Sequence, residues 1–403
     1  MNYEETIKKI NPIYFSAKAC LWFLAGIGDS DCARFYADIN KETLPALEVV
    51  TGDDFNHSRA ISIEARYNVW NAIAEDTDCQ TIIDLPCGYV PHSLIAARLN
   101  KNYYGFDLPI VIDEISRVAE KFLNEREKSL VQYHSVDATN YFSMRNALKD
   151  VHGKICIIMD GLLGYFNDYD LKVVCENIHR LLQEFGGCWY LSDSYSIDLM
   201  DVTYVALTGG SKDEMLQANI IGSSKVADND NSDHIFISGT LEERRRFMEE
   251  CGFKVESFRY PEKLKIIPSL KDNPDLMNKI LAAYNEIEEW VLTADAADLT
   301  EKNIDVPFAQ NFSVKDNILF VKISGRLDTI TAPKLLQQYE EYQAENNFTE
   351  IQIDAAELEY ISFAGLRAFN IMLDSLQDEN LFKIENVNAE VKKILNENGY
   401  TIN

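Results

Sequence analysis

Three acidic residues follow three successive apolar runs in the first half of the chain, and together they could bind a nucleoside. Asp84 ends the run "TIID", Asp107 ends "NYYGFD", and Asp137 follows "VQYHSV". Asp107 lies about 20 residues after the turn "LPCGY", a spacing at which an acid accepts hydrogen bonds from two ribose hydroxyls. Asp137 could accept a bond from the exocyclic amine of a purine. Each acid alone could equally cap a helix, but the set of three favours nucleoside binding.

The turn after the first acid argues against a ligand that contains phosphate. It lacks the G-x-G-x-x-G pattern of pyrophosphate binders, because only Gly88 is present and Pro86 stands where a glycine would sit. Proline has no backbone N–H to offer a phosphate. An adenosine that carries a sulfonium and an amino-acid tail fits these residues better, since it has a ribose and an adenine but no phosphate.

The elements that would position these acids alternate between strands and helices, which predicts an α/β fold. Short apolar runs predict strands, and the amphipathic stretches between them predict helices. The predicted strands span residues 81–85, 102–108, 131–138, 154–161 and 187–195, and the helices span residues 91–100, 112–125, 141–150 and 170–185. We therefore expect a Rossmann-like, mostly parallel sheet with helices on both faces. The three acids would lie at the carboxyl ends of its strands, where such sheets bind ligands.

The flanking segments complete a first domain, which we expect to span residues 1–292. Its residues 1–78 are predicted to form a helical cap region, and residues 198–240 read as irregular. The stretch from Ser194 to Asp233 would form a substrate lid. Later in the domain we expect a helix between Thr240 and Gly252, a strand over residues 254–260, and a helix over residues 275–292.

A second, smaller α/β domain is expected at residues 309–403, after a polar and acidic linker at residues 293–308. It opens with a predicted hairpin around Asp316–Asn317. Strands are then predicted over residues 350–358 and 381–387, and helices over residues 332–346, 363–379 and 389–399.

The first domain resembles the class I S-adenosylmethionine-dependent methyltransferases. More narrowly it resembles the leucine carboxyl methyltransferase family, which includes O-methyltransferases of polyketide biosynthesis. The resemblance covers roughly residues 55–260 and rests on "EARYNVWNAI", "DLPCGY", "GFDLP", "SVDA", "DGLLGYF" and "SGTLEERRRFMEECGFKVESF". It implies that the cofactor is S-adenosyl-L-methionine.

The resemblance also implies cofactor-binding residues. Arg66 would hold the cofactor's carboxylate through a charge-assisted bond. The other implied contacts are Asp84 and Gly88 at the methionine end, Asp107 at the ribose, Asp137 at the adenine, Asp160, Leu162 and Tyr165 beside the sulfonium, and in addition Leu108 and Ala138. Simpler interpretations stay open: Arg66 could pair with Glu64 or Asp76 on the surface, and Tyr165 could pack in the core.

The resemblance leaves the methyl acceptor open. Transfer to oxygen is an in-line displacement that needs alignment and a dry pocket more than a strong base. A small carboxylic acid is already ionised near neutral pH, whereas an alcohol or phenol would need a base. The candidates for that catalytic role are His134, Asp160 and Tyr165, although His134 could also be purely structural. Asp160 stands where the family has a glutamate and Gly164 where it has a larger apolar residue, so we expect these departures to affect pocket shape and activity rather than cofactor binding.

The second domain resembles the STAS domain of bacterial anti-sigma factor antagonists and sulfate transporters. The resemblance rests on "SGRLDTITAPKLL", the strand-ending Asp354 and "SFAGLRAF". In the antagonists, the residue two before the glycine of the last motif is phosphorylated. That glycine is Gly365, so the position is Phe363, which cannot accept a phosphate. Ser362 could serve as a displaced phosphosite, but we expect it to cap the following helix. Phe363 could anchor a protein partner or pack onto its own domain.

Composition excludes several other classes of protein. The formal net charge of -27 disfavours nucleic acid as a partner. The polar N-terminus is not typical of a signal peptide, and the apolar runs are too short to span a bilayer, so we expect a cytoplasmic protein that does not insert in membranes. The eight cysteines include no C-x-x-C pair, which favours reduced thiols and no metal site.

Three hypotheses follow from the sequence: a methyltransferase with a fused interaction domain, a regulatory protein that senses S-adenosylmethionine without turnover, and a scaffold with an inactive pocket. The predicted acids and Arg66 weigh against the scaffold. Turnover separates the first two hypotheses, because an enzyme that is given its acceptor accumulates S-adenosylhomocysteine and a sensor does not. The oligomeric state is not determined by the sequence.

Overall fold

The protein divides into two compact units in a computed structural model that describes residues 6, 7, 9, 16–41, 53–192, 196–214, 235–297, 306–400 and 402. The larger unit consists of Ile13–Val136 and Arg145–Leu299. The smaller unit consists of Met1–Pro12, Asp137–Met144 and Thr300–Asn403. Residues 194, 195 and 215–233 of the predicted lid and residues 298–305 of the predicted linker lie outside the described residues. Among the helices that are described, none has the length and apolar character needed to cross a membrane.

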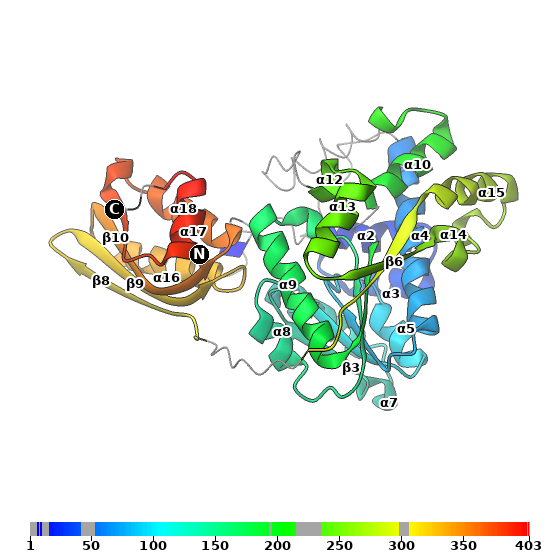
Figure 1. Cartoon of the computed structure of the whole chain (residues 1–403), viewed down its shortest axis with the longest axis horizontal. Coiled ribbons are helices and arrows are strands. Elements are labelled where there is room, and N and C mark those ends of the chain that lie inside the picture. The colour runs from blue at the N-terminus through cyan, green and yellow to red at the C-terminus, as the bar shows by residue number, and fades with distance from the viewer. Residues whose placement is uncertain are drawn as a thin grey trace. The chain divides into compact units, whose positions relative to one another are not determined.

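The larger unit is built on a seven-stranded sheet in the order β3-β2-β1-β4-β5-β7-β6 (Figure 1). The first five strands are parallel and β7 runs antiparallel to both of its neighbours. Their bounds are β1 (Thr81–Asp84), β2 (Asn102–Asp107), β3 (Val131–Ser135), β4 (Ile155–Met159), β5 (Gly187–Leu191), β6 (Lys254–Arg259) and β7 (Glu288–Thr293). The order reverses between β1 and β4, so the expected Rossmann-like fold is present with its switch point at those two strands.

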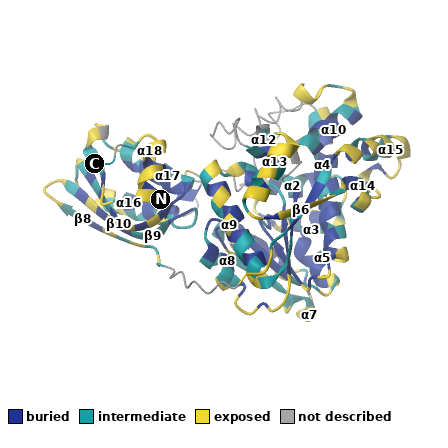
Figure 2. Cartoon of the chain, in the orientation of Figure 1, coloured by how far each residue is buried: buried dark blue, intermediate teal, exposed yellow. Residues whose placement is uncertain are grey.

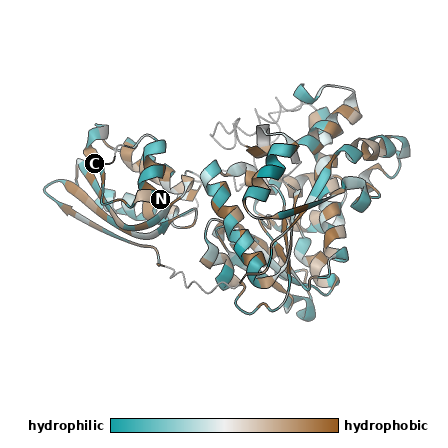
Figure 3. Cartoon of the chain, in the orientation of Figure 1, coloured by the Kyte–Doolittle hydropathy of each residue, from teal (hydrophilic) through white to brown (hydrophobic). Residues whose placement is uncertain are grey.

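Burial follows from position in the sheet. The central strands β1 and β4 are buried along their whole length, because helices cover both faces, whereas the edge strands β3 and β6 are partly exposed (Figure 2). The helices of the parallel part are α5 (His92–Arg98), α6 (Pro109–Glu120), α7 (Glu125–Lys128), α8 (Tyr141–Ala147) and α9 (Asp168–Phe185). The helix predicted after Thr240 is α13 (Leu241–Glu250), which is largely hydrophilic and carries the expected cap (Figure 3).

Helices precede the sheet, as the sequence predicts. They are α2 (Ser16–Gly26), α3 (Ser30–Asp38) and the long α4 (Asp53–Asp76). Asp29 caps α3 by accepting a bond from Cys32 N at 2.8 Å. The remaining helices of this unit are α10 (Ser196–Thr208), α12 (Ile235–Ser238), α14 (Tyr260–Lys263) and α15 (Pro274–Ala283), with short 3-10 turns at Leu163–Tyr165, Pro268–Leu270 and Tyr284–Glu286.

Two predictions for the later part of this unit are wrong. The helix expected over residues 275–292 ends at Ala283, and strand β7 follows it. The sequence misleads because apolar spacing suited to a helix continues past Tyr284, while Trp290 and Leu292 are fully buried between the neighbouring strands. Pairing with β5 and β6 decides the conformation there. In addition, α10 occupies part of the stretch predicted to be irregular.

The smaller unit holds a four-stranded sheet in the order β11-β10-β9-β8. Its elements are β8 (Ala309–Lys315), β9 (Ile318–Leu327), β10 (Glu350–Ile361), β11 (Phe382–Glu385), α16 (Ala332–Glu345), α17 (Phe363–Asp374) and α18 (Ala389–Glu397), with a 3-10 turn at Glu379–Leu381. The predicted hairpin is confirmed, with left-handed φ angles of 53° at Asp316 and 62° at Asn317. Asp354 does not end its strand: β10 continues through a register shift to Ile361.

Candidate functional site

The acid that ends β1 is bound by its own chain rather than left open. Asp84 is 2% exposed, and its carboxylate accepts bonds from Trp70 Nε1 (3.2 Å), His92 Nδ1 (2.9 Å) and Tyr103 OH (2.8 Å). The His92 ring stacks on Trp70 with 3.9 Å between ring centroids. Its carboxylate ties α4, α5 and β2 to the switch point. Contact of Asp84 with the methionine end of the cofactor stays a prediction.

Asp107 is held in a different way at the end of β2. It is 8% exposed, and it accepts one backbone bond on each oxygen: Gly88 N donates to Oδ2 and Leu108 N to Oδ1, both at 2.8 Å. A carboxylate has about four acceptor positions, so two remain for a ligand. Gly88 has a left-handed φ of 53°, which brings its N–H to the acid.

The electrostatics of Asp107 follow from its burial. Desolvation raises its pKa to about 7, with a further upward contribution from the nearby Asp84, while the two backbone bonds act in the opposite direction. A ligand that donates hydroxyl protons to this carboxylate would stabilise the ionised form.

The structure brings Arg66 and Asp160 together from α4 and the end of β4. Arg66 Nε donates to Asp160 Oδ1 at 2.8 Å, and Nη2 bonds to the same oxygen. Ser192 Oγ donates to that oxygen as well, at 2.5 Å. Of the two acids considered as surface partners of Arg66, Glu64 accepts bonds from Ser269 and Asp76 accepts one from Lys263. Asp160 therefore stands beside a cation at the end of β4.

Helix α2 covers the turn after β1. A Cβ at Gly88 would lie 3.5 Å from Ala17 Cβ. Lys18 donates to Glu114 Oε2 (2.7 Å) and lies 4.7 Å from the ring centroid of Tyr89. Burial raises the pKa of the Cys20 thiol, on which the charges of Arg66 and Asp160 also act. Helix α2 thus packs against the turn and against α6.

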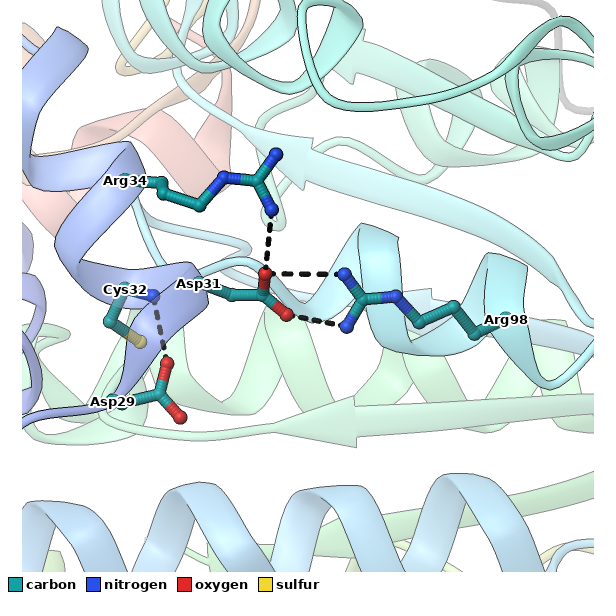
Figure 4. Close-up of polar contacts among 5 residues, drawn as sticks. All are labelled: Asp29, Asp31, Cys32, Arg34 and Arg98. Carbon is teal, nitrogen blue, oxygen red and sulfur yellow. Dashed lines mark hydrogen bonds and ion pairs between the residues drawn. The ribbon is translucent and has the colours of Figure 1, made fainter.

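Helix α3 is anchored to α5 by a charged cluster (Figure 4). Asp31 accepts bonds from Arg34 Nη1 (3.2 Å) and Arg98 Nη2 (3.2 Å), and Arg98 Nη1 bonds to its other oxygen. The hydrogen bond from Arg98 is the main cause that lowers the pKa of Asp31. The cluster fixes the cap helices to the helix that follows the turn.

The remaining candidates near β4 and β3 lie apart from one another. Tyr165 is 40% exposed, so it does not pack in the core. Leu162 precedes the 3-10 turn that contains Tyr165. His134 lies on edge strand β3, three strand positions from β4, and its Nε2 contacts Gln132 Oε1 at 3.2 Å. Strand spacing puts it roughly 14 Å from β4. The structure therefore does not bring His134 to Asp160 as a shared catalytic site.

Asp137 and Ala138 belong to the smaller unit by their contacts. Asp137 Oδ1 accepts bonds from Thr139 N (2.7 Å) and Thr139 Oγ1 (2.6 Å). Both residues are buried. Their contact with the adenine stays a prediction.

In the same unit, Ser362 is the N-cap of α17 and accepts a bond from Gly365 N at 3.4 Å, which confirms the capping prediction. A Cβ at Gly365 would meet Leu327 O at 2.7 Å, so only glycine fits there. Phe363 is half-buried, with the Arg367 guanidinium 4.9 Å from its ring centroid.

Sequence reasoning missed the partners that surround the predicted acids. Trp70, His92, Tyr103 and Ser192 come from four separate elements, and only folding places them at the switch point. Among these partners, only His92 could have been suspected from the sequence, because it directly follows the turn as the first residue of α5.

Comparison with known proteins addresses the two units separately. The family model described as "Mlab, STAS domain" matches residues 311–401. No curated protein matches the chain. A bacterial methyltransferase domain, CtHen1-C, is 14% identical over 58% of this chain and 100% of its own, with a TM-score of 0.35. An O-methyltransferase family protein from Burkholderia thailandensis is 12% identical over 61% of this chain and 60% of its own (TM-score 0.31).

Human N-acetylserotonin methyltransferase, solved in complex with SAM, is 12% identical over 69% of this chain and 67% of its own (TM-score 0.29). These three similarities are weak in both sequence and TM-score. The sheet order of the larger unit and the family match of the smaller one are the stronger observations. The chain thus joins a unit with a Rossmann-like α/β fold to a C-terminal STAS domain, which the family model matches at residues 311–401.

Proposed function

We propose that the larger unit is an S-adenosylmethionine-dependent methyltransferase that methylates an oxygen of a small-molecule carboxylate or hydroxyl. The arrangement of Asp107 carries this proposal. Its carboxylate is buried at the end of β2 and oriented by the backbone of Gly88 and Leu108, with acceptor capacity left for two vicinal hydroxyls. A ribose supplies such a pair.

The turn itself supports a ligand without phosphate. The N–H of Cys87 donates to Phe106 O at 2.9 Å, and the N–H of Gly88 donates to Asp107. These are the N–H groups that a pyrophosphate would need to contact. Because both are bonded within the chain, the turn suits an adenosine better than a dinucleotide.

The other residues of the larger unit would align the reaction rather than act as strong bases. Arg66 would hold the cofactor's carboxylate while Asp160 fixes the guanidinium. Leu162 and Tyr165 would lie beside the sulfonium, and Asp160 would place a negative charge near it. S-adenosylmethionine supplies the methyl group when bound, and a carboxylate acceptor would need no base. An alcohol or phenol acceptor would require Tyr165 or Asp160 in that role.

The domain limits belong to the same proposal. Residues 1–292 would form the methyltransferase with its helical cap, residues 293–308 the linker, and residues 309–403 the STAS domain. The STAS domain would bind a protein partner through the surface around Ser362 and Phe363, where the half-buried ring and its neighbouring Arg367 offer an apolar and a cationic group.

The test is isothermal titration of the full chain with S-adenosylmethionine and S-adenosylhomocysteine. We expect micromolar one-to-one binding that Asp107→Ala abolishes. Asp113→Ala, which removes an exposed acid on the neighbouring α6, is the matched control and should bind as wild type. No binding by wild type would overturn the proposal.

Turnover then decides between an enzyme and a sensor. With a panel of small carboxylic acids, an enzyme accumulates S-adenosylhomocysteine. Binding without turnover on any acceptor would favour the regulatory protein that only senses the cofactor.

A further inference from the structure

Two cysteines of the larger unit meet where helix α9 contacts the end of helix α13 (Figure 1). Cys175 lies on α9, and Cys251 is the C-cap residue of α13, shortly before β6 begins at Lys254. The two thiols are hydrogen-bonded to each other. Cys175 Sγ also lies 3.9 Å from Met248 Sδ on α13. Folding thus brings together two thiols that are far apart in the sequence.

A second contact fixes the turn after α13 against the same face of α9. Cys175 and His179 are four residues apart on the helix, so their side chains lie on one face. His179 Nε2 contacts Gly252 O at 3.2 Å, and the His179 ring lies 5.2 Å from the ring of Phe253. A Cβ at Gly252 would meet His179 Nε2 at 2.9 Å, so the turn approaches α9 closely. This approach holds Cys251 next to Cys175 in the folded protein.

The two thiols differ in exposure and in acidity. Cys175 is fully buried, whereas Cys251 is partly exposed. The hydrogen bond from Cys175 is the main cause that lowers the pKa of Cys251, and Lys172 acts in the same direction, while burial, Glu176 and Glu250 act against it. Burial raises the pKa of Cys175 well above its usual range. The thiolate of the pair therefore forms on Cys251, where small molecules in solution can reach it.

Other cysteines of the larger unit are less suited to react. Cys79 and Cys188 also share a hydrogen bond, but the pKa of each is raised, mainly by hydrogen bonds between thiols. A thiol with a raised pKa carries little thiolate near neutral pH, and the thiolate is the reactive form. Burial in the same way raises the pKa of the thiols of Cys20, Cys32 and Cys87.

We infer that Cys175 and Cys251 form a reversible disulfide when the protein meets hydrogen peroxide, with Cys251 as the thiol that reacts first. The Cys251 thiolate attacks one peroxide oxygen, which gives a sulfenic acid and releases hydroxide. The sulfur of Cys175 then attacks the sulfenic sulfur, and its proton leaves with the hydroxyl group as water.

The hydroxide of the first step takes up the proton that Cys251 lost on ionising. One peroxide is therefore reduced to two waters, while the two thiols give up two electrons. Such a disulfide is transient in a reducing compartment, because a thiol reductant returns both cysteines to the free form. The inference does not depend on the proposed cofactor.

The experiment exposes the reduced, full-length protein to hydrogen peroxide, removes the peroxide, and counts free thiols after denaturation. In the wild type we expect a loss of two thiols from the eight, which dithiothreitol restores. Digestion with trypsin without reduction should then give one cross-linked pair of peptides. They are residues 173–180 and residues 247–254, each of which contains a single cysteine.

Three variants assign the roles of the two thiols. Cys251→Ser should slow thiol loss by about tenfold or more, because the reacting thiolate is absent. Cys175→Ser should leave Cys251 as a sulfenic acid, which dimedone labels. Cys20→Ser removes another partly exposed cysteine, whose pKa is raised, and should lose two thiols as the wild type does.

The peptide map of the wild type keeps the test decisive if Cys175→Ser, a change at a buried position, does not fold. A cross-link between other cysteines, such as Cys79 with Cys188, would overturn the inference. An unchanged thiol count in peroxide-treated wild type would overturn it as well, as would equally fast thiol loss in Cys251→Ser. None of these outcomes affects the proposed function, which is tested by cofactor binding.

Discussion

Cofactor affinity is expected to depend on the ionisation of Asp107. The ribose hydroxyls of the proposed cofactor need an ionised acceptor, and burial raises the pKa of this carboxyl to about 7 in the free protein. Below that pH, part of the ligand's binding energy must remove the proton. S-adenosylhomocysteine affinity should therefore fall as the solution is acidified from about pH 8 to about pH 5.5.

The magnitude follows from the ionised fraction of the free protein. With a pKa of about 7, the carboxyl is roughly 90% ionised at about pH 8 and roughly 3% ionised at about pH 5.5. If only the ionised form accepts the ribose, the dissociation constant rises about 30-fold, or about 2 kcal/mol. The usual, unshifted aspartate pKa would give almost no change over this interval.

The assay is isothermal titration with S-adenosylhomocysteine at several pH values, with circular dichroism at each to verify the fold. Asp107→Asn is the matched variant because the amide keeps the size of the side chain but does not ionise in this range. It should bind about 10- to 100-fold more weakly at about pH 8, since it loses a charged acceptor, and its affinity should be nearly flat with pH. A wild-type affinity that varies less than about threefold, or a variant with the same pH profile, would refute the reasoning.

The raised pKa of Asp107 also affects the free energy of unfolding, and here the effect of pH is opposite to that on affinity: acid stabilises the fold while it weakens ligand binding. The folded pKa lies above the unfolded value of about 4, so the folded protein keeps a proton that the unfolded chain releases. This contribution is fully present below about pH 4 and is lost as the pH rises to about 7, a total of about 4 kcal/mol. Urea unfolding should show Asp107→Asn gaining stability relative to wild type over that interval.

Three further predictions concern stability. Asp84→Ala leaves the three donors Trp70, His92 and Tyr103 without an acceptor and should lower the unfolding free energy by about 3–5 kcal/mol, measured by urea denaturation; a loss under about 1 kcal/mol would contradict the role of Asp84 as a buried hub. Gly365→Ala should destabilise the STAS domain by about 1–3 kcal/mol, because the added methyl group would meet Leu327 O at 2.7 Å; an unchanged melting temperature would count against this close approach. Thr240→Ala removes the cap of α13 and should cost about 1 kcal/mol, with Thr240→Ser retaining wild-type stability.

Local patterns predicted most of the architecture. Each strand from β1 to β5 and the helices α5, α6, α8 and α9 lie within a few residues of their predicted ranges, because an apolar run bounded by a turn and an amphipathic stretch of helical period are properties of neighbouring residues. The short helix α7 was not predicted. The caps Thr240 and Ser362 were predictable for the same reason. The positions of Asp84 and Asp107 at strand ends also followed from the sequence.

The tertiary structure decided what those acids do. Asp84 and Asp107 have the same chemistry and the same position on neighbouring strands, yet one binds three side chains and the other two backbone N–H groups. Except for Leu108, which follows Asp107 directly, these partners lie on other elements, so no local pattern could separate the two roles. Strand β7 was missed on the same grounds, since its pairing with β5 and β6 outweighs its helical spacing. Sequence thus determines which residues can reach the site, and long-range packing determines which of their acceptor atoms stay open.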